Sequence, residues 1–378
     1  MSDRPIVLHD AFAFPGGGET VAVTLARAFA AGLVTGRFEP AAFPDGYFGG
    51  EAPCDLDARG RHPLAARLSM TLAMCLAFET LPRVATELAI HSGALAPLAH
   101  GRIAGPQILY CHTPPRILYD HRDFYLARQH PAKRPLYRLL LARYRRAYER
   151  AVAAMDVVVA NSETVRRRIS RFLDREAVVV HPPVDAGAFR HLGQEPFYLS
   201  TARVDVLKRV DVIVEAFRRL PDKRLVVVSG GSELGRVRDM AAGCPNIEIR
   251  GWTEAAELRR LVGTCLATVY IPRDEDFGIS PVESMAAGKP VIGVREGGLT
   301  ETVVDGETGI LLSPDPAPDD VARAVAGLTP DVATAMRQAC ERRARVFDTA
   351  VFLEKMAAVA EAARGACRGA APAPRRGG

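Results

Sequence analysis

The chain has 378 residues, a length typical of two domains, and 48% of them are apolar, which is enough for two buried cores. The formal net charge of +5 is modest. It favours anionic ligands or a membrane surface, and by itself does not indicate a nucleic-acid-binding protein.

The seven cysteines are scattered and include no C-x-x-C pair. This argues against a structural zinc site and a disulfide framework, and it predicts a reducing cytoplasm. The N-terminus does not resemble a signal peptide, because an apolar strand begins at Ile6. No apolar run approaches the ~20 residues of a membrane-spanning helix. We expect a cytoplasmic protein, and binding at the inner face of the membrane stays open.

An apolar strand at 6–9 is followed by Gly16, Gly17 and Gly18 and then by a helical pattern over 20–31. A strand, a glycine loop and a helix form the layout of a phosphate-binding turn. The spacing matches neither G-x-G-x-x-G nor a P-loop, which argues against dinucleotide and ATP sites. A tight turn that uses glycine for a positive φ would produce the same sequence.

His112 follows a clear apolar strand at 106–111 and precedes two prolines. The prolines prevent a helix from starting, so the strand should pass directly into a rigid loop. A histidine in that position faces the side of a parallel sheet where ligands bind. An ordinary loop histidine is the alternative. Earlier in the chain, 44–63 is predicted to be irregular and 64–81 to be helical.

Residues 132–155 are a predicted helix in which basic side chains alternate with leucines and tyrosines. Such a run of charge is usually a solvated helix face. The alternative is that the basic segment 133–150 docks on anionic lipid head groups, where each basic residue contributes about 1 kcal/mol.

Two prolines at 182 and 183 predict a stiff connection between domains. After them, apolar strands alternate with helical patterns, which implies a parallel sheet with helices on both faces. Arg203 and Lys208 follow the first of these strands. Two fixed cations can neutralise an anionic ligand without a metal, although most such pairs are simply surface cations ahead of a helix. Gly251 and Trp252 end a later strand, where Trp252 fits a ligand contact or a core aromatic equally.

The segment from Glu275 to Gly298 is the most informative part of the chain. An apolar strand precedes it, and a helix is predicted with Ser280 as N-cap and Glu283 three residues later. The two glutamates suit a polyhydroxyl ligand, but Glu283 is also explained by a capping box and Glu275 by a solvated loop. The free N–H groups at the helix start favour phosphate. They belong to Gly278, Ile279 and Ser280.

Glu275-x7-Glu283 encloses Phe277-Gly278 and is followed by Ala286-Ala287-Gly288-x-Pro290-Val291-Ile292. With Gly297-Gly298 and Asp305-Gly306 behind it, this pattern resembles the signature of retaining glycosyltransferase family four. The segment Tyr110-Cys111-His112-Thr113-Pro114-Pro115 resembles one that is common in bacterial mannosyltransferases of that family.

The resemblance implies a role for each candidate. Glu275 would contact hydroxyls of the donor sugar and Glu283 the ribose, while the turn at 251–253 contacts the base. The implied catalytic residues are His112, Arg203, Lys208 and Glu275. The implied nucleotide-sugar-binding residues are Gly16, Gly17, Gly18, Arg203, Lys208, Gly251, Trp252, Glu275, Phe277, Gly278, Ile279, Ser280 and Glu283.

The resemblance also implies an α/β protein of the GT-B fold, in which two Rossmann-like domains with parallel sheets face a central cleft. The expected parts are an acceptor-binding domain, a nucleotide-sugar-binding domain, a helix that packs back on the first domain and a disordered tail. Their bounds are 1–182, 183–346, 347–364 and 365–378.

The implied reaction moves a sugar to an acceptor hydroxyl with retention, and needs neither a cofactor nor a metal for chemistry. The donor is expected to be GDP-mannose, with a UDP-sugar as the alternative. Expected acceptors are a glycan or a polyprenyl-linked acceptor in polysaccharide synthesis, with a small molecule as the alternative. A non-catalytic module that binds sugar nucleotides is a further alternative, whereas no recognition motif supports nucleic acid.

Overall fold

The computed structural model describes residues 4–369, with side chains through residue 365. The chain divides into two compact units, Met1–His181 joined by the chain from Leu353 onward, and Pro182–Phe352. Residues 347–352 group with the second unit. There Phe347 packs edge-on against Phe277, with ring centroids 5.4 Å apart, and its carbonyl accepts a hydrogen bond from Val184 N.

Within residues 4–369, the first unit contains a seven-stranded sheet in which every strand pair is parallel. In spatial order the strands are β3 (Cys54–Asp55), β2 (Gly32–Thr35), β1 (Ile6–His9), β5 (Ala89–Ser92), β7 (Gln107–Cys111), β8 (Val157–Ala160) and β9 (Val178–Val179). A short parallel pair joins β4 (Val84–Ala85) and β6 (Ile103–Ala104). The inner strands β1, β5 and β7 are apolar and buried, as expected of a parallel sheet covered on both faces.

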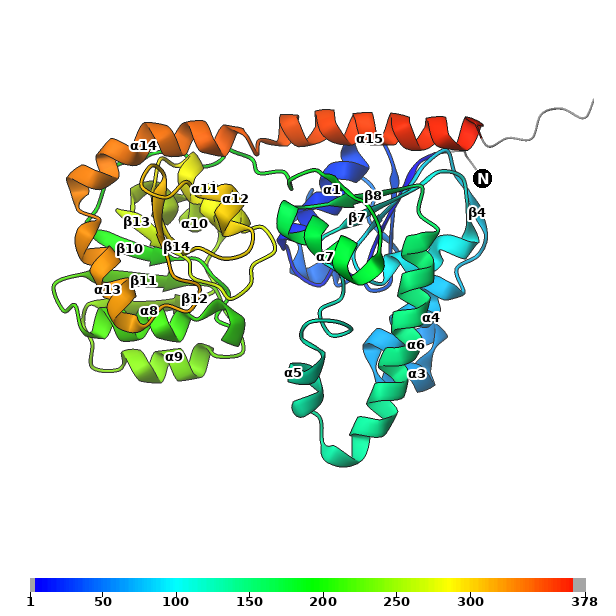
Figure 1. The fold of residues 1–378 in the computed structure, drawn as a ribbon, viewed down its shortest axis with the longest axis horizontal. Helices are drawn as coiled ribbons and strands as arrows, with labels where there is room; N and C mark the ends of the chain where they lie inside the picture. The colour runs from blue at the N-terminus through cyan, green and yellow to red at the C-terminus, as the bar shows by residue number, and fades with distance from the viewer. Residues whose placement is uncertain (1–3, 370–378) are drawn as a thin grey trace, which may run out of the picture. The chain divides into compact units, whose positions relative to one another are not determined.

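Some helices of the first unit lie against this sheet, and others extend away from it on one side (Figure 1). The helices of this unit are α1 (Gly17–Ala28), η1 (Pro40–Ala42), α2 (Ala58–Arg61), α3 (Pro63–Leu68), α4 (Met70–Glu79), η2 (Ala96–Arg102), α5 (Arg122–Ala127), η3 (Pro131–Lys133), α6 (Arg134–Ala153), α7 (Glu163–Leu173) and α15 (Thr349–Gly369).

Two expectations for the first unit are wrong in detail. The helix predicted over 64–81 is broken at Ser69, whose extended backbone ends α3 and whose Oγ accepts a hydrogen bond from Leu72 N to cap α4. The segment 44–63 is not wholly irregular, because it contains β3 and α2. Both differences arise from single polar residues that cap short elements, as Asp57 does for α2.

The second unit has, within the described residues, a six-stranded parallel sheet. Its spatial order is β12 (Ile247–Gly251), β11 (Arg224–Val228), β10 (Phe197–Ser200), β13 (Ala267–Val269), β14 (Val291–Val294) and β15 (Gly309–Leu312). Its helices are η4 (Val206–Lys208), α8 (Val210–Arg218), α9 (Leu234–Ala241), α10 (Ala255–Thr264), α11 (Ile279–Ala286), α12 (Leu299–Thr302), α13 (Pro318–Gly327) and α14 (Pro330–Arg345). Among them α8 contacts both α9 and α13, while α11 packs on α14 (Figure 1).

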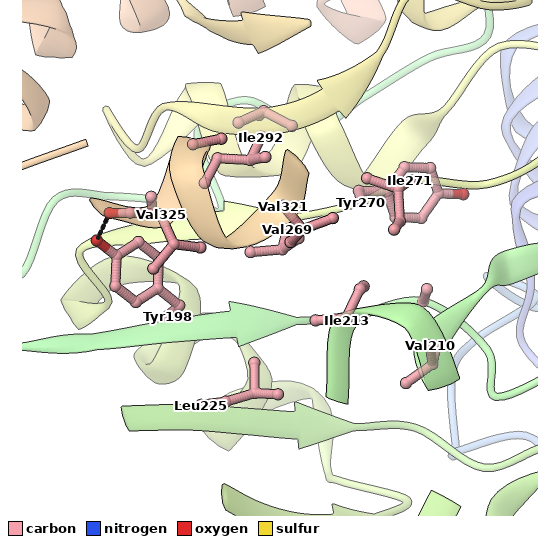
Figure 2. Packing of buried hydrophobic residues seen from close by; sticks show 14 of the residues in the cluster. Tyr198, Val210, Ile213, Leu225, Val269, Tyr270, Ile271, Ile292, Val321 and Val325 are labelled. Carbon is pink, nitrogen blue, oxygen red and sulfur yellow. Dashed lines mark hydrogen bonds between the residues drawn. The ribbon is translucent and has the colours of Figure 1, made fainter. Parts of the chain in front are cut away.

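The core of the second unit lies on both faces of its sheet, because successive strand residues point to opposite faces. In β10, Tyr198 joins one buried cluster, whereas Phe197 and Leu199 join another. Figure 2 shows the first cluster, where the Tyr198 hydroxyl donates a 2.8 Å hydrogen bond to the carbonyl of Val325 in α13. A tyrosine is therefore buried with its polar group satisfied.

The strand orders locate the ligand side of each sheet. In the first unit, the strands follow the chain in one direction from β1 to β3 and in the other direction from β5 to β9, so the order reverses between β1 and β5. In the second unit, the same reversal lies between β10 and β13. In open parallel sheets, ligands bind outside the carboxyl ends of the strands at such a reversal. The predicted class, α/β with two Rossmann-like domains and parallel sheets, is confirmed.

The C-terminal helix differs in length from the expectation. α15 runs to Gly369, so 365–369 is helical and not part of a disordered tail; Ala, Cys and Arg after Gly365 are compatible with a helix. Residues 370–378 of the predicted tail lie outside the described residues. Met356, Ala360 and Ala363 of α15 are buried, and Arg364 pairs with Glu87 at 3.3 Å. Between residues 4 and 369, no helix combines the length and apolarity needed to cross a membrane.

Candidate active site

In the second unit, a lysine and a glutamate from different loops meet at the strand-order reversal. Lys208 lies in η4, in the segment that follows β10, and Glu275 lies in the loop after β13. Lys208 Nζ is 2.5 Å from Glu275 Oε2 and 3.1 Å from the Tyr270 hydroxyl, which itself donates to Glu275 Oε2 at 2.9 Å. The three groups form a closed polar triangle, and Lys208 keeps one of its three N–H donors for a ligand.

The charge on Lys208 is stabilised by this triangle. Burial on its own would lower the pKa of Lys208, but Tyr270 and Glu275 outweigh burial and raise it. Burial also raises the pKa of the Tyr270 hydroxyl, so Tyr270 is a neutral hydrogen-bond donor. The site therefore presents a fixed, partly buried ammonium at neutral pH.

Arg209, the next residue, holds the loop that carries Glu275. It adopts φ +52° and is only 6% exposed. Its guanidinium donates to the carbonyls of Ile271 and Pro272, at 2.7 and 2.8 Å, and to that of Pro314 at 2.7 Å. A buried arginine that satisfies three backbone carbonyls positions the loop, and it was not among the residues singled out from the sequence.

The glycine pair at 297–298 allows the loop of Glu275 to approach the next strand's loop. A Cβ on Gly297 would lie 2.3 Å from the carbonyl oxygen of Glu275, and one on Gly298 would lie 2.3 Å from the Cα of Phe277. Gly298 N also donates to the Glu275 carbonyl at 2.8 Å. Larger residues would displace Glu275, so these glycines are explained by close backbone contact.

The predicted start of α11 is wrong by two residues. The N-cap is Gly278, with φ +89°, and the helix begins at Ile279. Ser280 therefore lies inside the first turn, and no side chain caps the helix. The left-handed backbone of Gly278 allows the earlier start, and Pro281 is tolerated in the first turn because its missing N–H has no partner there.

This correction removes the capping-box explanation of Glu283. Among the described residues, no hydrogen-bond or ion-pair partner of the Glu283 carboxylate is found, although the side chain is half-buried. Burial raises its pKa to about 7. A half-buried carboxyl group without a partner costs stability, and such groups are commonly found where a ligand binds.

The other predicted residues of the second unit lie on loops at the same edge of the sheet. The Arg203 side chain is 59% exposed and pairs with Asp205 at 3.1 Å, while Asp205 also accepts from Ser232 N. Gly251 ends β12 with φ +78°. Trp252 is 69% exposed, which excludes the core-aromatic interpretation.

In the first unit, three polar side chains meet at the reversal between β1 and β5. His9 ends β1, Ser92 ends β5, and His112 directly follows β7. His112 Nε2 lies 2.9 Å from Ser92 Oγ, and His9 Nδ1 lies 2.8 Å from the Ser92 carbonyl. Gly18 covers both rings, since a Cβ there would be 3.5 Å from His9 and 3.7 Å from His112.

Both histidines of this cluster are held neutral. Burial lowers the pKa of His9 to about 4, against a hydrogen bond with Ser92. Burial, followed by the neighbouring His9, lowers the pKa of His112 to about 3. Asp10 follows His9 and accepts hydrogen bonds of 2.8 Å from Ala94, Leu95 and Ala96 N. His112 thus offers a neutral imidazole as a hydrogen-bonding group.

The glycines differ from their predicted setting. Gly16 is the N-cap of α1, and Gly17 and Gly18 already belong to the helix, so they form its first turn instead of a preceding loop. None of the three has a positive φ, so the tight-turn alternative fails. Their N–H groups lie at the start of a helix directly after β1.

The structure adds His9, Ser92, Tyr270 and Arg209 to the residues that the sequence identified. His9 and Ser92 are 83 residues apart, and only strand pairing brings their ends together. The sequence contained one signal for these two residues: each is a polar residue at the end of an apolar strand.

Comparison with known proteins relates part of this chain to a family of glycosyltransferases. Residues 186–347 match the family "Glycosyl transferases group 1". The match covers most of the second unit and none of the first. The structure resembles that of HepE from Anabaena, solved with UDP and glucose. The TM-score is 0.69 over 94% of this chain and 99% of that one, at 16% identity. The chain therefore has the GT-B fold of solved glycosyltransferases.

Curated relatives are more similar in sequence than HepE, but the matches cover less of the chain. The chain is 27% identical over 255 residues to the alpha-1,3/1,6-mannosyltransferase of Dictyostelium discoideum, a match that covers 55% of this chain and 58% of the relative. It is 33% identical over 194 residues to the D-inositol 3-phosphate glycosyltransferase of Xylanimonas cellulosilytica, covering 43% and 46%. The chain thus spans about half the length of the curated relatives that it matches.

Proposed function

We propose that the protein is a retaining glycosyltransferase that moves a sugar from a nucleotide-sugar donor to an acceptor hydroxyl. The observation that carries the proposal is the second unit's strand-order reversal. The charged Lys208 lies in η4 after β10, and α11 follows β13 with the N–H groups of its first turn and with Glu283, which has no polar partner among the described residues. A nucleoside diphosphate sugar offers each of these its complement: anionic phosphates for the ammonium and the amides, and ribose hydroxyls for Glu283.

The donor would be held in a defined order along this edge. Glu283 accepts hydrogen bonds from the ribose, and the amides of Gly278, Ile279 and Ser280 bind phosphate. Glu275, fixed by Lys208 and Tyr270, accepts from sugar hydroxyls. Phe277 is 2% exposed and packs in the core of the second unit, while the exposed Trp252 beside Gly251 is available to the base.

In the chemical step, the bond from the anomeric carbon to the diphosphate oxygen breaks, and a bond to the acceptor oxygen forms on the same face. The leaving phosphate oxygen takes the proton of the acceptor hydroxyl, so no enzyme nucleophile is required. Arg203 and Lys208 stabilise the charge that develops on the leaving group, which is where preorganised electrostatics contributes most. His112, neutral and held by Ser92, hydrogen-bonds the donor sugar.

GDP-mannose is the donor that we propose, on the strength of the Tyr110–Pro115 segment. The mannosyltransferase relative from Dictyostelium discoideum agrees with this choice. A UDP-sugar is the second candidate, favoured by the likeness to HepE solved with UDP and glucose. The remaining alternative, a sugar-nucleotide-binding module without activity, is disfavoured by the ordered Lys208–Tyr270–Glu275 triangle.

The acceptor that we propose is a glycan or a polyprenyl-linked acceptor in polysaccharide synthesis, met by a cytoplasmic enzyme at an anionic membrane surface. The basic helix α6 supports this proposal, because Arg138, Arg145 and Arg146 are exposed on it. Replacing all three arginines by glutamate and measuring liposome flotation tests whether this helix binds the membrane. Binding should need anionic lipid and fall as salt rises.

The decisive experiment offers the purified protein a panel of labelled nucleotide sugars, with membrane extract as the acceptor. Transfer or slow hydrolysis of GDP-mannose, with the anomeric configuration retained in the product, is the expected result. Turnover of UDP-sugars without turnover of GDP-mannose would mean that the donor is a UDP-sugar. Tight nucleotide binding without turnover of any donor would favour the non-catalytic module.

A further inference from the structure

The first unit contains an apolar groove that none of the transfer residues lines. Residues of α3, α4 and α6 line it, and it encloses about 400 Å³. These helices lie next to one another in Figure 1. This volume falls within the range of small-molecule sites. Leu72, Leu136, Tyr137 and Leu140 are among its lining residues. The groove is therefore large enough for a ligand and apolar in character.

Apolar side chains also stand exposed at its edge. Leu68 of α3 is 69% exposed and Leu136 of α6 is 51% exposed, and both line the groove. Exposed leucines on facing helices lose contact with water only when something fills the space between them. An apolar ligand that enters the groove would remove this surface from water.

The charge at the groove is positive. Its charged lining residues are Arg67, Lys133 and Arg143, and no acidic residue lines it. Arg143 is already paired with Glu79 at 2.5 Å. Among the described residues, Arg67 and Lys133 have no ion-pair partner, and both are exposed. An occupant with one anionic group would complement these two cations while its apolar part fills the groove.

We propose that this groove binds one hydrocarbon chain of an anionic, phosphate-bearing membrane lipid, with the phosphate at Arg67 and Lys133. An apolar chain explains the exposed leucines, and the phosphate explains the unpaired cations, whereas free phosphate would leave the leucines in water. The site is distinct from the basic face of α6, because Arg138 and Leu139, although exposed, do not line it. It does not depend on sugar transfer.

The first test titrates the full chain with dodecyl phosphate below its micelle concentration, using calorimetry. We expect one binding site, and about fifteenfold weaker binding for decyl phosphate, which is two methylenes shorter, because each methylene contributes about fourfold. Inorganic phosphate and dodecyltrimethylammonium should both bind at least about tenfold more weakly than dodecyl phosphate. Equal binding of inorganic phosphate, or equal binding of the cationic amphiphile, would overturn the proposal.

Matched variants locate the site. Leu136→Glu and Lys133→Glu change the groove, while Leu139→Glu and Arg138→Glu make the same changes at exposed positions of α6 that do not line it. We expect the first pair to lose at least about tenfold in affinity for dodecyl phosphate and to stop floating with phosphatidylglycerol vesicles. The second pair should keep full affinity for dodecyl phosphate, because neither residue lines the groove. Flotation is compared only between Leu136→Glu and Leu139→Glu, because Arg138 also belongs to the basic face of α6.

Equal losses in all four variants would mean a diffuse basic surface and would refute the groove. Unchanged binding in Leu136→Glu would refute it as well. Leu136 is half exposed, so the substitution should fold, and thermal unfolding checks this. Should Leu136→Glu nevertheless unfold, Arg67→Glu measures the same site from α3, and retention of full dodecyl phosphate affinity there would also refute the proposal.

Discussion

The two strand-order reversals lie at equivalent places in two parallel sheets, yet they carry opposite chemistry. At β1 and β5, His9, Ser92 and His112 form a buried cluster in which burial keeps both imidazoles neutral. At β10 and β13, Lys208 and Glu275 form an ion pair that raises the pKa of the lysine despite burial. The sheet decides where a site lies, and the residues on the loops decide whether it holds charge.

The difference follows from the partners that each buried group finds. A buried imidazole that meets a hydroxyl and a carbonyl has no counter-charge, so it gives up its proton. A buried ammonium beside a carboxylate keeps its charge, because the pair offsets the cost of leaving water. The neutral site therefore suits hydrogen bonding to a sugar, whereas the charged site suits a leaving diphosphate.

The largest effect is expected from the charged site. Arg203→Ala and Lys208→Ala should each lower kcat by about 10²–10³-fold, because each removes a fixed cation from the developing negative charge. Arg218→Ala is the matched control, since Arg218 lies on the exposed face of α8, where its ion pair is with Glu215 at 2.7 Å. Initial rates with saturating donor measure the effect. A loss confined to KM would contradict a role in the transition state.

Glu283 is expected to show the next largest effect. Glu283→Gln should weaken binding of a nucleoside diphosphate by about 10- to 100-fold, because hydrogen bonds to a charged group are worth about 1.5–3 kcal/mol. Ser280→Ala should change stability by less than about 0.5 kcal/mol, since Ser280 does not cap α11. Calorimetric titration and urea unfolding measure the two. A stable Glu283→Gln variant with normal nucleotide affinity would contradict the proposal that Glu283 binds the ribose.

The two sites should also respond to pH with opposite signs. Folding lowers the pKa of His9 from 6.5 to about 4, so below pH 6.5 the unfolded chain binds more protons than the folded chain. Acid therefore lowers the free energy of unfolding. His9 alone should account for a loss of about 2 kcal/mol between pH 6.5 and 5. The pKa of Glu283 rises from 4.5 to about 7, so the folded chain binds more protons in that window, and stability falls as pH rises through it.

Hydrogen exchange followed by mass spectrometry resolves these trends in the separate units. Protection of β1 and β5 should decrease from pH 6.5 to 5, after correction for intrinsic exchange. Glu283→Gln should remove the opposite trend in β13 and β14 and leave the first unit unchanged. Parallel trends in both units would contradict the contrast between the sites.

The smallest effect is expected from metal ions. If Arg203 and Lys208 neutralise the leaving group, magnesium or EDTA should change turnover by less than about twofold. Dialysed enzyme assayed with each addition measures this. Strict dependence on a divalent cation would mean that the two side chains are insufficient, and the charged site would need a third positive group.

Much of this protein could be derived from local sequence. The alternation of apolar strands and helices after the two prolines predicted the parallel sheet of the second unit, because each element carries its own pattern of burial. The parallel sheet of the first unit was expected only from the family resemblance. The spacing Glu275-x7-Glu283 placed both acids near one helix start, since seven residues cannot separate them far. The GDP-mannose and membrane hypotheses stay predictions, because the sequence pattern suggested them.

The tertiary structure decided what depends on contacts between distant residues. The left-handed Gly278 sets the start of α11, although Ser280 fits the sequence rule for a cap equally well. Within residues 4–365, whose side chains are described, Glu283 has no polar partner. His9 and Ser92 became neighbours only because β1 and β5 pair across 83 residues. Local patterns are set by short-range sterics and burial, whereas a site's protonation and partners depend on which strand ends the fold brings together.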